Sequence, residues 1–344
     1  MNQDARSRAP GRTDLRPALE VSGLDVVYSL KRPGMFAPAP RLKAVSSGAF
    51  MIAPGETLGV VGESGCGKSS LARAVIGLVP ANAGRITLLG RDLGKADKSA
   101  WKDARRNMQM VFQDPLASLN PRMTARQIVA EPLGACRPDL SRGERGERVV
   151  RILNRVGLAD GQLDRYPHEF SGGQCQRIGI ARALAPGPAV VICDEAVSAL
   201  DVSIRAQIVD LLMELQDELG LALVFIAHDL AVVRQISHRV VVMYLGRAME
   251  IAHSEHLYGR PMHPYTRALI EAAPIPDPKV ERNRTREPLQ GEPPSLLNPP
   301  PGCAFSARCS FAIDRCRREP PELRPVARSM VACHRAEEIA PSGA

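Results

Sequence analysis

The sequence predicts an α/β fold built on a mostly parallel β-sheet that is covered by helices on both faces. Continuous apolar segments at 57–61, 189–193 and 221–227 are typical of strands that are buried on both sides. The segment 204–218 repeats apolar residues at helical spacing, and 69–78 also has the character of a helix. Strands that alternate with helices in this way build doubly covered sheets.

Composition excludes several other classes of protein. The chain has 344 residues, of which 44% are hydrophobic and 24% charged, so wholesale disorder and a collagen-like structure are excluded. Lys and Arg outnumber Asp and Glu by 45 to 37, a net charge of +8 that permits an anionic neighbour without requiring one. No run of 18 apolar residues occurs, so we expect no membrane span. The eight cysteines are not needed as a disulfide framework at this length, which favours a reducing compartment.

Changes in composition suggest the domain organisation. The arginine-containing segment 1–17 is not followed by an apolar segment, so we expect a disordered basic arm rather than a secretory signal. A main domain is expected over 18–262, and it is expected to include a small β subdomain. Arginine-rich, helical spacing predicts an inserted helical subdomain at about 114–186. Prolines then multiply, and we expect an irregular extension over 263–335, held in place by something other than a conventional core, followed by a tail at 336–344.

The segment GESGCGKS at 62–69 fits the phosphate-loop pattern G-x-x-x-x-G-K-[ST] in full. It follows a predicted strand and opens a predicted helix, where backbone N–H groups and the helix N-terminus surround phosphate oxygens. Lys68 can then reach the β- and γ-phosphates, and the Ser69 hydroxyl can bind Mg²⁺. The expected contacts with ATP in this segment are Gly62, Ser64, Gly65, Cys66, Gly67, Lys68, Ser69 and Ser70.

Two further segments carry groups suited to phosphate chemistry. VVICDE at 190–195 is an apolar strand that ends in two acids, which places Asp194 to hold Mg²⁺ and Glu195 to activate a water. A strand followed by a solvated acidic turn is the alternative, and the phosphate loop makes it the weaker one. FSGGQ at 170–174 precedes a basic helical stretch and predicts a second anion cradle, although Ser-Gly-Gly alone is a common linker fragment.

The order of these motifs carries a resemblance to a known family. GESGCGKS, Gln113, FSGGQ, VVICDE, SALD at 198–201 and His228 follow one another at plausible distances. The set resembles the nucleotide-binding subunit of an ABC transporter over about residues 18–262. The resemblance implies a P-loop NTPase fold of the ABC type that hydrolyses ATP to ADP and phosphate.

The resemblance also implies roles for single residues. Glu195, His228 and Gln113 would be catalytic: Gln113 would contact Mg²⁺ or the lytic water, and His228 would bind the γ-phosphate and orient Glu195. Tyr28 would stack on the adenine. The γ-phosphate of ATP held by an opposing subunit would be contacted by the signature residues Ser171, Gly172, Gly173 and Gln174. Asp201 would lie in the loop that crosses the dimer seam, although an N-cap of the helix at 204–218 explains it almost as well.

Other segments look like the peptide and nickel importer branch of the family, namely QDPLASLNPR at 113–122, HPYTRAL at 263–269 and GEPPS at 291–295. The branch implies import of di- or oligopeptides, with nickel, glutathione or another small solute as alternatives. It also implies a second ABC ATPase subunit in a heterodimer, two transmembrane permease subunits and an extracytoplasmic solute-binding protein. The chain would then lie peripherally on the cytoplasmic face of the inner membrane.

A soluble ABC-type ATPase that acts on nucleic acid or ribosomes is a rival hypothesis suggested by the basic charge. DNA-repair members of the family separate the phosphate loop from the signature by long coiled coils, and no sustained heptads occur between 62 and 171. Translation-type members usually carry two cassettes, whereas this chain has one phosphate loop. We therefore expect no direct contact with nucleic acid.

The last cysteines of the chain have the spacing of a four-thiolate site. They are Cys303, Cys309, Cys316 and Cys333. Thiolates hold iron–sulfur clusters or Zn²⁺. The resemblance favours a [4Fe–4S] cluster, because some members of the branch carry one in the matching segment. The adjacent His334 leaves Zn²⁺ open, and four reduced thiols without metal are the third alternative.

Overall fold

The structure is a computed structural model that describes residues 16–32, 34, 38–94, 98–273, 291–292 and 294–339. The expected basic arm lies outside these residues apart from its last two positions. Part of the expected extension, at 274–290 and 293, and the end of the expected tail, at 340–344, also lie outside them.

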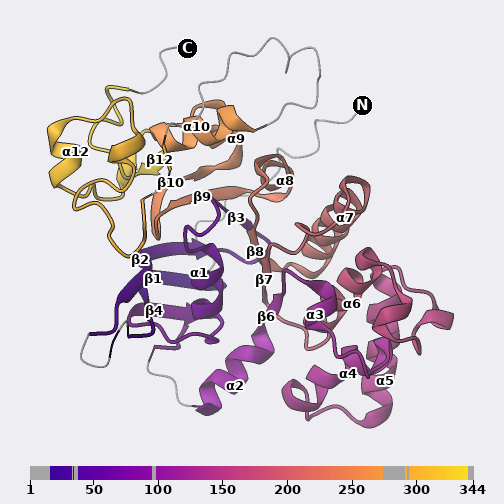
Figure 1. Ribbon diagram of the computed structural model, residues 1–344. Coiled ribbons are helices and arrows are strands. Elements are labelled where there is room, and N and C mark those ends of the chain that lie inside the picture. Colours follow the sequence, from indigo (N-terminus) through magenta and orange to yellow (C-terminus); the bar gives the residue numbers. More distant parts are fainter. Residues whose placement is uncertain are drawn as a thin grey trace.

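Two sheets form the framework of the molecule (Figure 1). The smaller sheet is antiparallel, and its order is β2 (Arg41–Ile52), β1 (Leu19–Ser29), β4 (Ala83–Leu88) and β5 (Arg91–Asp92). The larger sheet has eight strands in the order β11 (Arg324–Val326), β12 (Ser329–Val331), β10 (Arg247–His253), β9 (Arg239–Tyr244), β3 (Thr57–Val61), β8 (Ala222–Ile226), β7 (Val190–Asp194) and β6 (Met108–Val111). Strands β9, β3, β8, β7 and β6 are parallel, which confirms the predicted fold class.

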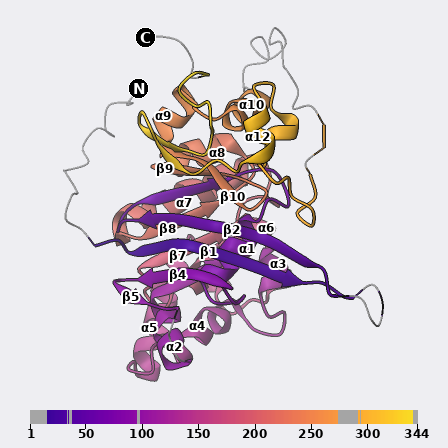
Figure 2. The same ribbon diagram turned by 90° about the vertical axis from the view of Figure 1, so that its left-hand side faces the viewer.

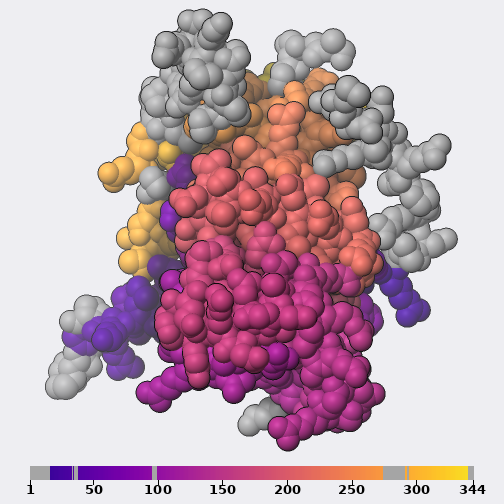
Figure 3. Space-filling view, turned by 90° about the vertical axis from the view of Figure 1, so that its right-hand side faces the viewer, coloured from indigo at the N-terminus to yellow at the C-terminus, as the bar shows by residue number. Residues whose placement is uncertain are grey.

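Helices follow the strands of the large sheet and fill the region between β6 and β7. The elements are α1 (Lys68–Val75), α2 (Lys98–Asn107), α3 (Pro115–Ser118), α4 (Ala125–Cys136), α5 (Arg142–Arg155), η1 (Asp160–Gln162), η2 (Pro167–Glu169), α6 (Gly172–Leu184), α7 (Val202–Leu219), α8 (Leu230–Ile236), α9 (Ser254–Gly259), α10 (Pro264–Ala272), η3 (Ser306–Arg308) and α12 (Asp314–Arg318). The space-filling view shows α3 to α6 (magenta) directly below the segment with α7 and α8 (salmon) (Figure 3).

Three helices of the region between β6 and β7 begin with the same N-terminal capping motif. Thr124, Ser141 and Ser171 are the N-caps of α4, α5 and α6, and each forms a capping box with the residue three positions later. A capping box satisfies two backbone N–H groups that a helix otherwise leaves unpaired. The starts of these helices are therefore set locally by the sequence.

The core lies on both faces of the large sheet. All residues of β7 and β8 are buried. This is expected of continuously apolar strands in a sheet that is covered on both faces. One cluster packs α4 to α8 against one face, and a second packs α1 and the antiparallel sheet against the other. Figure 2 shows the antiparallel sheet at the front, below the C-terminal segments drawn in yellow.

The described parts of the C-terminal extension, at 263–273, 291–292 and 294–335, are continuous with this core. Its strand β12 pairs with β10 of the large sheet, with Glu250 opposite Val331. Cys303, Ala304 and Phe305 belong to the same buried cluster as α4 to α8. The expectation that the extension is held by something other than a conventional core is therefore wrong for its described residues.

Candidate nucleotide-binding and catalytic site

Four parallel strands of the large sheet bring the predicted catalytic segments to one edge. The phosphate loop follows β3, Gln113 follows β6, Glu195 follows β7 and His228 follows β8. Because carboxyl ends of parallel strands meet at the same edge, residues far apart in the sequence come together there. The order β3-β8-β7-β6 places these segments side by side.

The phosphate loop requires glycine at two positions. Gly62 has φ +154°, and a Cβ there would lie 2.2 Å from the carbonyl oxygen of Met243. Gly67, the N-cap of α1, has φ +104°, and a Cβ there would lie 2.1 Å from the carbonyl oxygen of Ala44. Both distances are far inside van der Waals contact, so any side chain would displace the loop.

Lys68 is held inside the loop by its own carbonyl groups. Its ammonium donates to the carbonyl oxygen of Gly62 at 2.8 Å and to that of Glu63 at 3.0 Å, and the residue is only 4% exposed. Cys66 is also buried, with its sulfur 3.8 Å from the Lys68 ammonium, and burial raises the pKa of its thiol. The buried thiol packs beneath the loop, which leaves the backbone N–H groups to face a phosphate.

Ser69 and Asp194, the two residues expected to share Mg²⁺, are in contact. The Ser69 hydroxyl donates to Asp194 Oδ1 at 2.8 Å. Asp194 is 2% exposed at the end of β7, and burial raises the pKa of its carboxyl against the opposing effect of the Ser69 hydrogen bond. A hydroxyl and a carboxylate are hard oxygen ligands of the kind that Mg²⁺ prefers, so the two residues fit the ion.

Glu195 and Gln113, both expected to be catalytic, are also joined. The amide nitrogen Nε2 of Gln113 donates to Glu195 Oε2 at 2.8 Å. Glu195 adopts φ +49°, in the left-handed region that non-glycine residues rarely occupy, and its N–H donates to Ile226 O at 3.0 Å. Such backbone strain concentrates at functional sites, where surrounding contacts impose it.

Three other predicted residues make no hydrogen bond, among those described, to the Ser69–Asp194 or Gln113–Glu195 pairs. Tyr28 lies at the end of β1, and its hydroxyl donates to Ser70 Oγ at 3.3 Å, beside the phosphate loop. His228 is exposed, and within the described ranges no hydrogen bond joins it to Glu195. Asp201 occupies the N-cap position of α7 without a side-chain cap, so capping does not account for its exposed carboxyl. The roles of His228 and Asp201 stay predictions.

The signature segment begins α6 and is shaped by its capping box. The Gln174 N–H donates to Ser171 Oγ at 3.3 Å, and the Ser171 N–H donates to Gln174 Oε1 at 3.0 Å. Ser171 and Gly172 are exposed. A Cβ at Gly173 would lie 2.5 Å from Ile204 Cγ2, so this glycine lets α6 and α7 approach closely. The start of α6 is therefore open to a second molecule.

The structure adds contacts to the loop that sequence reasoning missed. The Glu63 carboxylate accepts hydrogen bonds from Arg308, and the Glu63 N–H donates to the Tyr265 hydroxyl at 3.0 Å. Both partners belong to the C-terminal extension. The sequence around Arg308 has no motif that predicts a contact with the phosphate loop. Glu63 and Arg308 are 245 positions apart, so the contact depends on how the extension folds back onto the core.

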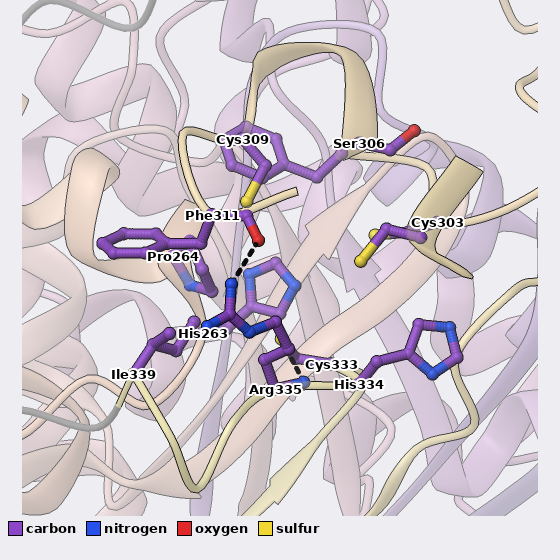
Figure 4. Close-up of a pocket in the computed structure, with 12 residues that line it drawn as sticks. His263, Pro264, Cys303, Ser306, Cys309, Phe311, Cys333, His334, Arg335 and Ile339 are labelled. Atoms are coloured by element: carbon purple, nitrogen blue, oxygen red, sulfur yellow. Dashed lines mark hydrogen bonds between the residues drawn. The ribbon is translucent and has the colours of Figure 1, made fainter. Parts of the chain in front are cut away.

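The four C-terminal cysteines line one pocket, together with His263 and Phe311 among others (Figure 4). Its cavity of about 10 Å³ has room for about one water molecule. Burial raises the pKa of Cys303 to about 12 and that of Cys333 to about 11. In the part of the chain that the structure describes, no group of three or more His, Cys, Asp or Glu side chains is placed to hold a metal ion. The four predicted cysteine ligands therefore lie around one pocket, but they are not arranged as a metal site.

A phosphate loop between β3 and α1, with an oxygen pair for Mg²⁺ and a carboxylate at neighbouring strand ends, defines a P-loop nucleoside triphosphatase. The family model "ABC transporter" matches residues 45–198, and "Oligopeptide/dipeptide transporter, C-terminal region" matches 249–316. The oligopeptide transport ATP-binding protein OppF of Haemophilus influenzae is 56% identical over 88% of this chain and 92% of its own length. OppF of Escherichia coli is 53% identical over 93% and 97%. The chain therefore belongs to the ABC transporter family, in its oligopeptide/dipeptide transporter branch.

Solved structures agree with this membership. An ATP-binding cassette dimer in a post-hydrolysis state, bound to ADP and Pi, has a TM-score of 0.61 and 27% identity, covering 69% of this chain and 98% of that one. A dimeric bacterial ABC transporter cassette has a TM-score of 0.60 and 26% identity over the same shares. The chain is an ABC-type ATPase. Among its described residues, no helix is long and apolar enough to cross a membrane.

Proposed function

We propose that this chain hydrolyses ATP to energise the import of peptides, as one ATPase subunit of a multisubunit ABC transporter. The observation that carries the proposal is identity above 50% with oligopeptide transport ATP-binding proteins along about nine-tenths of both chains. The match to the C-terminal region of oligopeptide/dipeptide transporters supports the same branch. The expected partners are a second ABC ATPase subunit, two transmembrane permeases and an extracytoplasmic binding protein, with the chain peripheral at the cytoplasmic face of the inner membrane.

The chain's own residues divide the chemistry of ATP hydrolysis among them. Lys68 turns from the loop carbonyls to the β- and γ-phosphates. Ser69 and Asp194 would hold Mg²⁺, which would neutralise developing charge on the phosphate oxygens. Glu195 accepts a proton from the attacking water, and Gln113 fixes the direction of its carboxylate. Tyr28 stacks on the adenine.

A second subunit completes the site. The start of α6, where Ser171 and Gly172 are exposed, would meet the γ-phosphate of ATP bound in the loop of the opposing subunit. The expected contacts are Ser171, Gly172, Gly173 and Gln174. Backbone N–H groups at a helix N-terminus suit a phosphate oxygen. ATP then joins the two subunits, and its hydrolysis releases them. His228 and Asp201 contribute from the same interface.

The test is uptake of labelled peptide by vesicles that contain the assembled transporter. Lys68→Ala is expected to abolish ATP-dependent uptake, whereas Lys102→Ala, which removes an exposed lysine of α2, is expected to leave it unchanged. Peptide uptake that survives Lys68→Ala would refute the proposal. ATP-dependent uptake of nickel or glutathione without peptide would retain the ATPase role and overturn the choice of solute. Co-purification with nucleic acid rather than with membrane proteins would favour the rival hypothesis.

We also propose that the four C-terminal cysteines hold a metal centre, either a [4Fe–4S] cluster or Zn²⁺. Their convergence on one pocket supports this, with Cys316 in α12, Cys303 and Cys309 before that helix and Cys333 after it. Thiolates suit both centres. The cavity of about 10 Å³ and the absence of a formed ligand group among the described residues mean that the cysteine side chains must rearrange around either centre.

Anaerobic purification followed by metal analysis tests the metal centre. A cluster is expected to give broad absorption near about 400 nm and bound iron, whereas zinc gives a colourless protein with one bound ion. Cys309→Ser is expected to lower the metal content, and Cys136→Ser, outside the pocket, is the matched control. Metal-free protein with an ordered extension would refute the proposal.

A further inference from the structure

Glu63 of the phosphate loop is bound through all of its polar groups. Both of its carboxylate oxygens accept from Arg308 Nη1 at 2.9 Å. Its N–H donates to the Tyr265 hydroxyl at 3.0 Å, and its carbonyl oxygen accepts from the Lys68 ammonium at 3.0 Å. Two of these three partners, Arg308 and Tyr265, come from the C-terminal extension, and the third is the lysine expected to bind the phosphates of ATP.

The Arg308 side chain is held by contacts other than the one with Glu63. Its side chain is 6% exposed, Nη1 also donates to the Tyr244 hydroxyl at 3.3 Å, and its guanidinium carbon lies 5.9 Å from the centre of the Tyr244 ring. Its N–H donates to Phe305 O at 3.0 Å, which closes the short helix η3. The guanidinium is therefore held toward Glu63 by the core residue Tyr244 and by the backbone of η3 in the extension.

The aromatic side chains around this contact lock the extension onto the core. The Phe305 ring meets the Tyr244 ring edge-on, with centroids 5.5 Å apart, and lies 5.3 Å from the Tyr265 ring. Tyr244 ends β9 and Tyr265 lies in α10, so the cluster joins the large sheet, α10 and η3. Tyr244 and Tyr265 are at most 1% exposed, which leaves little freedom for movement.

A displaced Glu63 would displace an acceptor of Lys68. The Lys68 ammonium donates to two successive carbonyl groups, those of Gly62 and Glu63, so a change in the backbone at Glu63 alters the position of the charge that binds phosphate. The ion pair is partly buried, because the Arg308 side chain is 6% exposed and that of Glu63 is 23% exposed. Loss of the arginine leaves the Glu63 carboxylate without its counter-charge and without the contact that holds it in place, so the loop is free to shift. The extension and the phosphate loop are thus mechanically connected.

We propose that Arg308 is a positioning residue for the phosphate loop, through which the C-terminal extension sets the affinity of the site for ATP. The inference rests on the proposed function in requiring that ATP bind at this loop. It adds that the loop binds ATP with full affinity only while the extension holds Glu63. An ATPase domain without this extension would therefore need a different support for the same loop.

The experiment measures binding of Mg-ATP to the full chain by calorimetry, and KM and kcat for ATP in the assembled transporter. Arg308→Gln is expected to weaken ATP binding and to raise KM by about 5- to 50-fold, with kcat at saturating ATP changed less than about twofold. Arg308→Lys, which keeps the charge, is expected to recover part of the affinity. Arg315→Gln breaks an exposed ion pair with Glu319 in the same extension and is expected to change neither constant.

A double-mutant cycle distinguishes positioning from general damage. Glu63→Gln is expected to weaken ATP binding as Arg308→Gln does, and the double variant to be no weaker than either single one, because both remove the same contact. Wild-type ATP affinity in Arg308→Gln, or additive effects in the cycle, would overturn the inference. If Arg308→Gln fails to fold, Arg308→Lys and Glu63→Gln decide in the same way. Failure of the wild-type chain to bind ATP would instead refute the proposed function.

Discussion

At the scale of single residues, the site joins side chains whose chemistry the sequence already indicated. The contacts Ser69–Asp194 and Gln113–Glu195 link residues that were each predicted from a motif. These motifs are predictable because a phosphate loop and an acid-tipped strand depend on short-range spacing. The contact between Glu63 and Arg308 could not be predicted, because it depends on how the extension folds back over 245 positions.

Glu195 is the residue whose substitution most sharply separates binding from chemistry. Glu195→Gln keeps the size of the side chain and the Gln113 contact but removes the proposed base, so we expect ATP binding to persist while turnover falls by about 10²–10⁴-fold. Steady-state ATPase assays together with calorimetry measure the two effects. Hydrolysis at the wild-type rate would show that another group activates the water.

At the scale of elements, helix starts and buried strands can be predicted from local sequence. The edge of the large sheet formed by β11 and β12 cannot. The strands expected at 189–193 and 221–227 correspond to β7 and β8, and the helix expected at 204–218 lies within α7. Strands β11 and β12 have three residues each and form only because β10 pairs with β12. Such short strands carry too little periodicity to be predicted.

The capping boxes of α5 and α6 provide a matched pair of variants. Ser141→Ala and Ser171→Ala remove the same bond, which is 3.3 Å long in both helices, so each is expected to lower the free energy of unfolding by about 1 kcal/mol. Only Ser171→Ala is expected to lower ATPase activity in the assembled transporter, because only that serine is proposed to contact the opposing nucleotide. Denaturant unfolding and ATPase assays measure both effects. Equal losses of activity in the two variants would indicate that Ser171 acts only as a cap.

At the scale of the whole molecule, the proposed function assigns two half-sites and a support to one chain. The phosphate loop with the neighbouring strand ends would be one half-site and the start of α6 the other, while the extension contacts the loop through Glu63. In this proposal each site is completed by the start of α6 of a facing subunit. ATP-dependent closure would then convert binding energy into movement of the subunits.

Sedimentation velocity tests this arrangement most directly. The Glu195→Gln chain is measured with and without Mg-ATP, alone and mixed with the second ATPase subunit of its transporter, and Lys68→Ala serves as the control. The account predicts a two-subunit complex that forms only with ATP and only while Lys68 is present. Absence of any ATP-dependent complex, or an equal amount of complex with Lys68→Ala, would contradict it.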